Sequence, residues 1–455
     1  MSLSAISAPL LFRHLGVVRY GVYVTIGSLI TVAAGLTELG MTAISVREWA
    51  TQPPARRKLL QGQLLGTRLV AALLGTAGAA LFGVIVGYGT NRFAGIGLLG
   101  LGLLASTYFE ALTVPLQAQL RQGQIAAAEI VRQAVQLAAI GGLIAAGAGL
   151  VPFFAIGVPG ALAATAVAFA GGAQLVRPRL GDRYWWRLLR DAAPFAAASA
   201  ISVFYLRSTL IVCSLVATPR QTGYFGTAFR VMEVLIGVPL MASSALFPLL
   251  ARSAAGDVER FQGAGRRIIE TALIAGGLAA ALVFAGAPLA VYVITGHSYA
   301  PSVESLELLG AGLAASFVGA SSQYMLLALR GHRSILAING CAVAVNLLLS
   351  SLLASALGAI GAALALALSE LLVGSLSLAL LLRRGLRIGF TPKTLLKSAG
   401  AVAAIAVAAL VGGQVDSIVR LAAGCGAALL CVKALKLLPP ELTAALPDWA
   451  SRLVS

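Results

Sequence analysis

The side chains of this sequence that could bind a polar ligand lie inside long apolar stretches, and the clearest pair is Arg230 and Glu233. In a helix over 223–252 they are one turn apart, and Gly226 and Gly237 share their side in a sector of roughly 60 to 80°. An arginine guanidinium suits a pyrophosphate because its fork of donors matches the oxygens, and the carboxylate would neutralise it in the empty site. The alternative interpretation is a self-neutralising pair that binds no ligand.

A second polar face occurs near the N-terminus, in the apolar stretch 21–42. Ser28, Thr31 and Glu38 fall on one side of the predicted helix. When the two stretches are aligned at the glycine and aromatic residue that begin each of them, Ser28 corresponds to Arg230 and Thr31 corresponds to Glu233. A charge that faces hydrocarbon is costly, so such a face must meet protein or water. We therefore expect both faces to line a substrate path.

Two further groups of polar side chains lie within apolar stretches. Glu129, Arg132 and Gln136 share one face of the predicted span 124–148, where mutual neutralisation at i,i+3 competes with cavity lining as the explanation. Arg207 lies deep in the next predicted bundle. The predicted substrate-cavity residues are Arg230, Glu233, Glu38, Ser28, Thr31, Arg207, Glu129, Arg132 and Gln136.

The sequence contains no constellation typical of an enzyme. The aspartates lie in predicted loops or the tail without a D-x-D pair, and the three histidines, His14, His297 and His332, are scattered. Neither an H-E-x-x-H nor a G-x-S-x-G motif is present. We therefore expect no catalytic residue, no metal site and no cofactor. Coupling to a proton or sodium gradient remains an open alternative at this point.

The composition is that of a polytopic membrane protein. Of the 455 residues, 59% are hydrophobic and 11% charged, and the mean hydropathy is +0.92; a charged share of about 25% is usual in soluble domains. The four cysteines lie in apolar stretches without metal-type spacing, which is typical of packing residues. A net charge of +17 would suggest nucleic acid in a soluble chain. Here the basic residues lie in loops, and we expect no nucleic-acid partner.

Hydropathy predicts a short first helix followed by complete spans. Residues 3–12 are apolar but too few to cross a bilayer, so the first helix is predicted to be truncated. The segment 177–194 is basic and aromatic, and it predicts an interfacial helix with Trp185 and Trp186 at headgroup level. Complete spans are predicted near 21–44, 66–89, 93–117, 124–148, 153–176, 192–216, 222–249, 267–294, 303–329, 334–356, 359–382, 395–412 and 416–437.

The spans form an internal repeat of six. Leu120-Arg121 before the fifth span echoes Leu329-Arg330 before the eleventh, and Pro159-Gly160-Ala161 echoes Ile360-Gly361-Ala362. A unit with an even number of spans returns to its starting side, so the halves are predicted to be parallel repeats around a central cavity. The predicted fold is an all-α polytopic membrane protein of two six-helix bundles. Its parts are an N-lobe at 1–180, a C-lobe at 181–390, and two extra helices with a tail at 391–455.

The distribution of basic residues predicts the orientation in the membrane. Arginines and lysines are concentrated in the loops after the even-numbered spans, such as 56–58, 266–267 and 383–387, and few lie on the other side, such as Arg92 and Arg220. The positive-inside rule makes the basic side cytoplasmic. With an even number of spans, both termini are then cytoplasmic.

Four stretches resemble the polysaccharide and O-antigen flippases of the multidrug/oligosaccharidyl-lipid/polysaccharide exporter superfamily. They are LFRHLGVVRYGVYVTIGSL with TELGM after it, ATPRQTGYFGTAFRVMEVLIGVPLMASSALFPLLAR, ITGHSYAPSVESLELLG and VNLLLSSLLASALGAIGAALALALSELL. The resemblance implies two six-helix bundles around a cavity. It also implies transport of an isoprenoid-pyrophosphate-linked oligosaccharide across a bacterial cytoplasmic membrane by alternating access. The implied partners are that substrate, membrane lipids, and a polymerase or glycosyltransferases of the same pathway.

The chain departs from the family pattern at two positions. The family usually has a full first helix, and often an acid after the arginine of the seventh span, where this chain has Ser208. Two other functions remain as alternatives. A cation-coupled multidrug antiporter of the same superfamily would use deep acids such as Glu38 and Glu233. A membrane polysaccharide polymerase or ligase would need a large extracytoplasmic loop with catalytic side chains.

Overall fold

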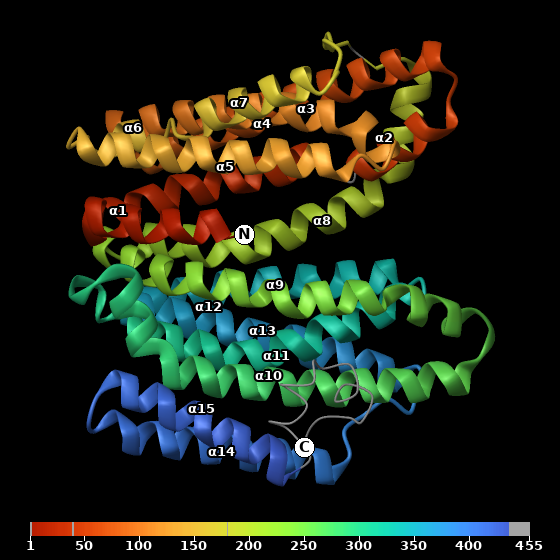
Figure 1. Cartoon of the computed structure of the whole chain (residues 1–455). Helices are drawn as coiled ribbons and strands as arrows, with labels where there is room; N and C mark the ends of the chain where they lie inside the picture. The colour runs from red at the N-terminus through yellow and green to blue at the C-terminus, as the bar shows by residue number, and fades with distance from the viewer. Residues whose placement is uncertain (1, 39–40, 180, 436–455) are drawn as a thin grey trace. The chain divides into compact units, whose positions relative to one another are not determined.

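Helices and the loops that join them account for all residues that the computed structural model describes, 2–38, 41–179 and 181–435 (Figure 1). Twelve helices in these ranges are long and apolar enough to cross a membrane, and α8 adds the shorter apolar segment Ala200–Val216. The helices are α1 Ser2–Glu38, α2 Met41–Thr51, α3 Pro54–Val86, α4 Thr90–Ala118, α5 Gln122–Ala145, α6 Leu150–Phe153, α7 Gly157–Ala170, α8 Arg183–Val216, α9 Pro219–Gly256, α10 Val258–Thr295, the 3₁₀ turn η1 His297–Tyr299, α11 Ser302–Ala328, α12 His332–Leu357, α13 Ala359–Arg383, α14 Pro392–Gly413 and α15 Ser417–Ala434. The chain is therefore the predicted all-α polytopic membrane protein.

The chain divides into two compact units, Met1–Leu215 and Val216–Ser455. The division lies at the end of α8. In the first unit, Ile211 of α8 packs in one buried cluster with Ile26 of α1 and Ile96 of α4. Because α8 completes this cluster, it belongs by its packing to the first unit.

The first helix begins with a short segment that turns at Gly16 into the helix that follows. Gly16 interrupts α1 with φ 69° and ψ 170°, a conformation that glycine adopts without strain, so α1 is two helices joined at a turn. The rings of Phe12 and Tyr20 lie 4.3 Å apart; eight residues of straight helix would separate them by about 12 Å. His14 Nε2 lies 2.9 Å from the carbonyl oxygen of Ala148, which fixes the turn at the end of α5.

The segment 177–194 is not a separate interfacial helix. From Arg183 onward it forms the first part of α8, which continues to Val216. Trp185 is only 1% exposed, and its Nε1 donates a 2.8 Å hydrogen bond to Thr67 Oγ1. Trp186, in contrast, is 56% exposed. Trp185 is thus packed against α3, where Thr67 provides the partner that the N–H of a buried tryptophan needs.

The loop before α8 lies against a glycine ridge on α3. Arg179 N donates a 2.9 Å hydrogen bond to the carbonyl oxygen of Gly62. A Cβ at Gly66 would overlap the carbonyl group of Arg179. Glycine at these positions therefore lets the loop backbone pack directly on the helix, which holds the loop between α7 and α8 in place.

The internal repeat is visible in the turns after α4 and α11. Leu120 (φ 57°) and Arg330 (φ 56°) are the non-glycine residues with a left-handed backbone in the described part of the chain. In both turns the next N–H bonds to the carbonyl five residues earlier, at 2.8 Å. The equivalent positions are therefore Leu120 and Arg330, so the match between the two Leu-Arg pairs predicted from sequence is displaced by one residue.

The repeat also extends to two helix crossings. A Cβ at Gly160 of α7 would lie 3.0 Å from the carbonyl oxygen of Arg132 on α5. A Cβ at Gly361 of α13 would overlap the carbonyl of Leu353 on α12. Both glycines of the predicted Gly-Ala echo thus sit where two helix backbones meet closely.

The two extra helices, α14 and α15, are attached to the second unit by charged side chains. Arg420 of α15 donates to the carbonyl oxygen of Phe284 on α10 at 2.7 Å and to Glu307 Oε1 on α11 at 2.6 Å. Glu270 of α10 accepts a 3.1 Å hydrogen bond from Thr391 N, at the start of α14. The predicted tail beyond residue 435 lies outside the described residues.

Candidate functional site

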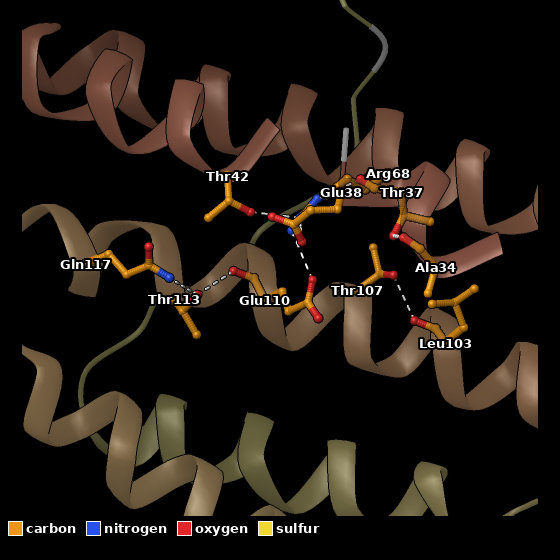
Figure 2. A network of polar contacts seen from close by, with 10 residues as sticks. All are labelled: Ala34, Thr37, Glu38, Thr42, Arg68, Leu103, Thr107, Glu110, Thr113 and Gln117. Atoms are coloured by element: carbon orange, nitrogen blue, oxygen red, sulfur yellow. Dashed lines mark hydrogen bonds and ion pairs between the residues drawn. The ribbon is translucent and has the colours of Figure 1, made fainter. Parts of the chain in front are cut away.

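A buried arginine, Arg68 of α3, organises the main charged site of the first unit (Figure 2). Its side chain is 0% exposed, and its Nη2 donates to Glu38 Oε2 at 2.9 Å and to Thr42 Oγ1 at 2.8 Å. Its Nη1 lies 3.2 Å from Glu110 Oε2, an ion pair without hydrogen-bond alignment. One guanidinium thus joins the C-terminal part of α1 and the start of α2 to the C-terminal third of α4.

Arg68 also contacts the backbone of α1. Its Nε donates a 3.1 Å hydrogen bond to the carbonyl oxygen of Thr37, in the last described turn of α1. Of the predicted span 21–44, the residues up to Glu38 lie on α1 and Thr42 lies on α2, and residues 39–40 fall outside the described ranges. The arginine thus holds the C-terminal part of α1 against α3.

The carboxylates of this site face outward while the arginine lies behind them. The Glu38 side chain is 54% exposed and that of Glu110 is 45% exposed, against 0% for Arg68. Two carboxylates share one guanidinium. When both carboxylates are ionised, the cluster therefore has a net charge of −1. A partly open site with a surplus carboxylate can accept a proton or a cation.

Glu129 and Arg132 of α5 form the predicted pair within the same unit. Arg132 donates from Nε to Glu129 Oε2 at 2.9 Å and from Nη2 to Oε1 at 2.6 Å, and Gln133 adds a third bond to the carboxylate. Gln136 packs against Gly160 of α7, where a Cβ would lie 2.6 Å from its Cγ.

The other predicted residues of the first unit are Ser28, Thr31 and Arg207. Ser28 is buried, and its Oγ has no hydrogen-bond partner among the described residues. Thr31 Oγ1 donates to the carbonyl oxygen of Gly27 in its own helix at 2.8 Å. Arg207 is half-buried on α8. Of the residues that were predicted in this unit, the structure joins Glu129 to Arg132, and it joins Glu38 to an arginine that was not predicted.

In the second unit, Arg230 and Glu233 of α9 form the predicted one-turn pair. Arg230 Nη1 donates to Glu233 Oε2 at 2.9 Å. The two side chains are 46% and 30% exposed. A solvent-exposed ion pair of this kind typically contributes about 0 to 1 kcal/mol to folding.

A second acid of this unit, Glu370 of α13, is buried among polar side chains. Ser316 Oγ of α11 donates to Glu370 Oε2 at 2.6 Å, and Asn346 of α12 bonds to Ser369 Oγ at 3.1 Å. These contacts join three helices of the bundle. Because Glu370 is only 8% exposed, we interpret it as a packing group.

Sequence reasoning missed Arg68. Its signal was an arginine in an apolar stretch that contains no acid of its own to neutralise it. The partners are 30 and 42 positions away, so helical spacing within one span could not reveal them. No group of three or more histidine, cysteine, aspartate or glutamate side chains suited to a metal occurs within the described ranges.

The fold is that of transporters of the MOP superfamily. The chain superimposes on a lipid II flippase MurJ in an inward closed conformation with a TM-score of 0.76 at 12% identity, covering 95% of this chain and 96% of that one. An inward-facing multidrug resistance MATE transporter of the MOP superfamily matches with a TM-score of 0.63 at 14% identity, over 84% and 97% of the two chains. The eukaryotic MATE transporter AtDTX14 gives 0.56 at 14% identity, over 88% and 98%.

The sequence itself defines the family. Residues 1–254, more than half of the chain, match the family described as "Polysaccharide biosynthesis protein". The chain belongs to this family. No curated protein matches it in sequence.

Proposed function

We propose that this protein is a flippase that moves an isoprenoid-pyrophosphate-linked oligosaccharide from the cytoplasmic to the outer leaflet of a bacterial cytoplasmic membrane. The observation that carries the proposal is the half-exposed Arg230 pair on a span-length helix of a polysaccharide-biosynthesis family member. The likeness to a lipid II flippase supports it at the level of the fold. Transfer of such a lipid between the leaflets of vesicles tests it directly.

The physical task is to move a polar headgroup past hydrocarbon. Moving unpaired polar groups into an apolar medium costs several kcal/mol for each group. A cavity between two lobes that opens alternately to each side would keep the sugar and pyrophosphate hydrated, while the isoprenoid chain stays in the lipid. In this scheme Arg230 binds the pyrophosphate, and Glu233 neutralises Arg230 when the site is empty.

We further propose that the Arg68 cluster couples transport to a proton gradient. Glu38 and Glu110 share one guanidinium, so one carboxylate can take up a proton without leaving Arg68 unpaired. A protonation that changes the charge at the junction of α1, α2 and α4 would bias the first unit between two arrangements.

A multidrug antiporter, the first alternative, needs acids available for cations. Glu129 and Glu233 each have an arginine of their own, whereas Glu38 and Glu110 share Arg68. The pairing of Glu129 and Glu233 counts against cation binding at those two acids, and the Arg68 cluster is compatible with either function.

A polymerase or ligase, the second alternative, needs room for a catalytic domain. The loops at the ends opposite the basic ones are short. They comprise residues 87–89, 146–149, 217–218, 296–301, 358 and 414–416. The longest holds six residues, which argues against a catalytic outer loop.

The proposed orientation predicts which loops are reachable from outside the cell. Asn91 and Arg384 are both exposed, at opposite ends of their helices. In a variant without the four native cysteines, a cysteine at Asn91 should react with a membrane-impermeant maleimide in intact cells, and one at Arg384 should react only after lysis. The reverse pattern would overturn the assignment of the basic side to the cytoplasm.

A further inference from the structure

The first unit contains a basic pocket at one end of its helices. The residues that line it have no role in the proposed function. The pocket has a volume of about 370 Å³, within the range of about 300 to 1,000 Å³ typical of small-ligand sites. It lies where α3 begins and α4 and α7 end. Its lining includes Arg57, Lys58 and Arg121.

The lining of the pocket contains no acid to neutralise these cations. Its other polar groups are amides, such as Gln119 and Gln174, and backbone from the turn after α7. Glu48 on the neighbouring α2 is engaged elsewhere: its carboxylate accepts from Tyr184 Oη at 2.7 Å and pairs with Arg47. The hydrogen bond from Tyr184 is the main cause that holds the pKa of Glu48 below its usual range. The pocket therefore keeps its positive charge.

The pocket is held in shape by contacts of its own walls. Arg57 Nε donates to the carbonyl oxygen of Gln52 at 2.9 Å, and its guanidinium lies 4.5 Å from the ring centroid of Trp49. Gln61 Nε2 donates to the carbonyl oxygen of Ala111 at 3.0 Å. Fixed donors lose little conformational entropy when a ligand arrives, so the site is prepared for an anion.

The position of the pocket indicates the source of that anion. Its cations lie at the ends of apolar spans, Arg57 and Lys58 in the first turns of α3 and Arg121 in the turn between α4 and α5. These ends correspond to the headgroup layer of a bilayer. One wall is apolar, formed by Leu112, Pro115 and Leu116. A lipid presents a phosphate next to apolar glycerol and acyl groups, and basic pockets between membrane helices suit such headgroups.

We propose that this pocket binds the phosphate of a membrane lipid headgroup. Arg57 grips the phosphate with its planar fork, Lys58 and Arg121 add charge at the exposed rim, and the apolar wall receives the start of the lipid chain. Two lipids carry this chemistry: an anionic glycerophospholipid of the bilayer, and an isoprenoid pyrophosphate on its way into the transporter.

The test compares binding of matched lipids to the purified full chain by native mass spectrometry. The probes are phosphatidylglycerol, an isoprenyl pyrophosphate, and diacylglycerol, which has the same tails as phosphatidylglycerol without the phosphate. The variant is Lys58→Gln with Arg121→Gln, because both side chains are exposed and the fold should tolerate their loss. The control is Arg333→Gln with Lys393→Gln, two exposed cations of the second unit.

Wild type and control should bind a phosphate-bearing lipid, and the variant should bind it at least about tenfold more weakly, a difference of about 1.4 kcal/mol. Whichever of the two phosphate lipids loses more affinity in the variant is the occupant. Inorganic pyrophosphate should compete in wild type. Three results would overturn the proposal. Diacylglycerol could bind as tightly as the phosphate lipids, or the variant could bind them with wild-type affinity. The protein could also bind inorganic pyrophosphate but neither of the two phosphate lipids. Arg57→Lys, which keeps the charge without the fork, should weaken binding while the protein stays folded.

Discussion

Replacing Glu38 and Glu110 together with glutamine is expected to destabilise the first unit by about 3 to 5 kcal/mol, because it leaves the fully buried Arg68 without an anion. For a domain of this size such a loss lowers the midpoint of thermal unfolding by roughly 6 to 20 °C. Heating the detergent-solubilised protein and measuring the fraction that remains monodisperse gives this midpoint.

Removing the arginine should destabilise the first unit less than removing its two acids. Arg68→Met removes the buried charge itself and leaves two carboxylates that are already about half exposed and can be hydrated. The triple variant with Arg68→Met should therefore be more stable than the double glutamine variant. Glu304→Gln, an exposed acid on α11, is the control, with an expected loss below about 1 kcal/mol. A double glutamine variant as stable as wild type would show that Arg68 finds its anion elsewhere.

The single variant Glu110→Gln separates the coupling role from the structural one. It leaves Arg68 paired with Glu38, so the protein should fold, but the surplus carboxylate is lost. If the cluster couples transport to protons, the pH dependence of transport should flatten in this variant. A pH profile identical to that of wild type would contradict the coupling proposal and leave the stability prediction intact.

Replacing Arg230 with glutamine is expected to reduce transport about 10- to 100-fold in well-folded protein. A hydrogen bond to a charged group contributes about 1.5 to 3 kcal/mol, and each 1.4 kcal/mol is a factor of ten. Folding should change by less than about 1 kcal/mol, since the Arg230–Glu233 pair is partly exposed. Transport per folded molecule in vesicles measures the effect, with Arg220→Gln, an exposed arginine at the start of the same helix, as the control.

The double variant distinguishes an anion site from a mere ion pair. If Arg230 only neutralises Glu233, then Arg230→Gln with Glu233→Gln should restore both folding and transport. If it binds the pyrophosphate, the double variant should remain inactive, because the ligand still lacks its cation. A wild-type transport rate from Arg230→Gln alone would rule out the anion-site role.

Local patterns in the sequence predicted the local features of this protein. Runs of apolar residues located the spans, and the i,i+3 spacing of Glu129 with Arg132 and of Arg230 with Glu233 predicted both ion pairs. These features depend on helical geometry within one segment, which the sequence determines directly.

Features that depend on contacts between distant segments could not be predicted in this way. Arg68 lies within a predicted span, yet its partners Glu38 and Glu110 belong to other helices, as does the Thr37 carbonyl to which it donates. Trp185 has the pattern of an interfacial residue, but its N–H is satisfied by Thr67 in the interior. In each case a tertiary hydrogen bond outweighed the preference that the local sequence indicated.

The most direct test of the proposed function uses vesicles that contain only the purified protein and a fluorescent isoprenoid-pyrophosphate-linked oligosaccharide. A quencher that cannot cross the bilayer reports how much of the label reaches the outer leaflet. The proposal predicts transfer much faster than in protein-free vesicles, and loss of this gain with Arg230→Gln. Transfer no faster than in protein-free vesicles, together with proton-dependent uptake of a cationic dye by the same protein, would contradict the flippase and favour the antiporter.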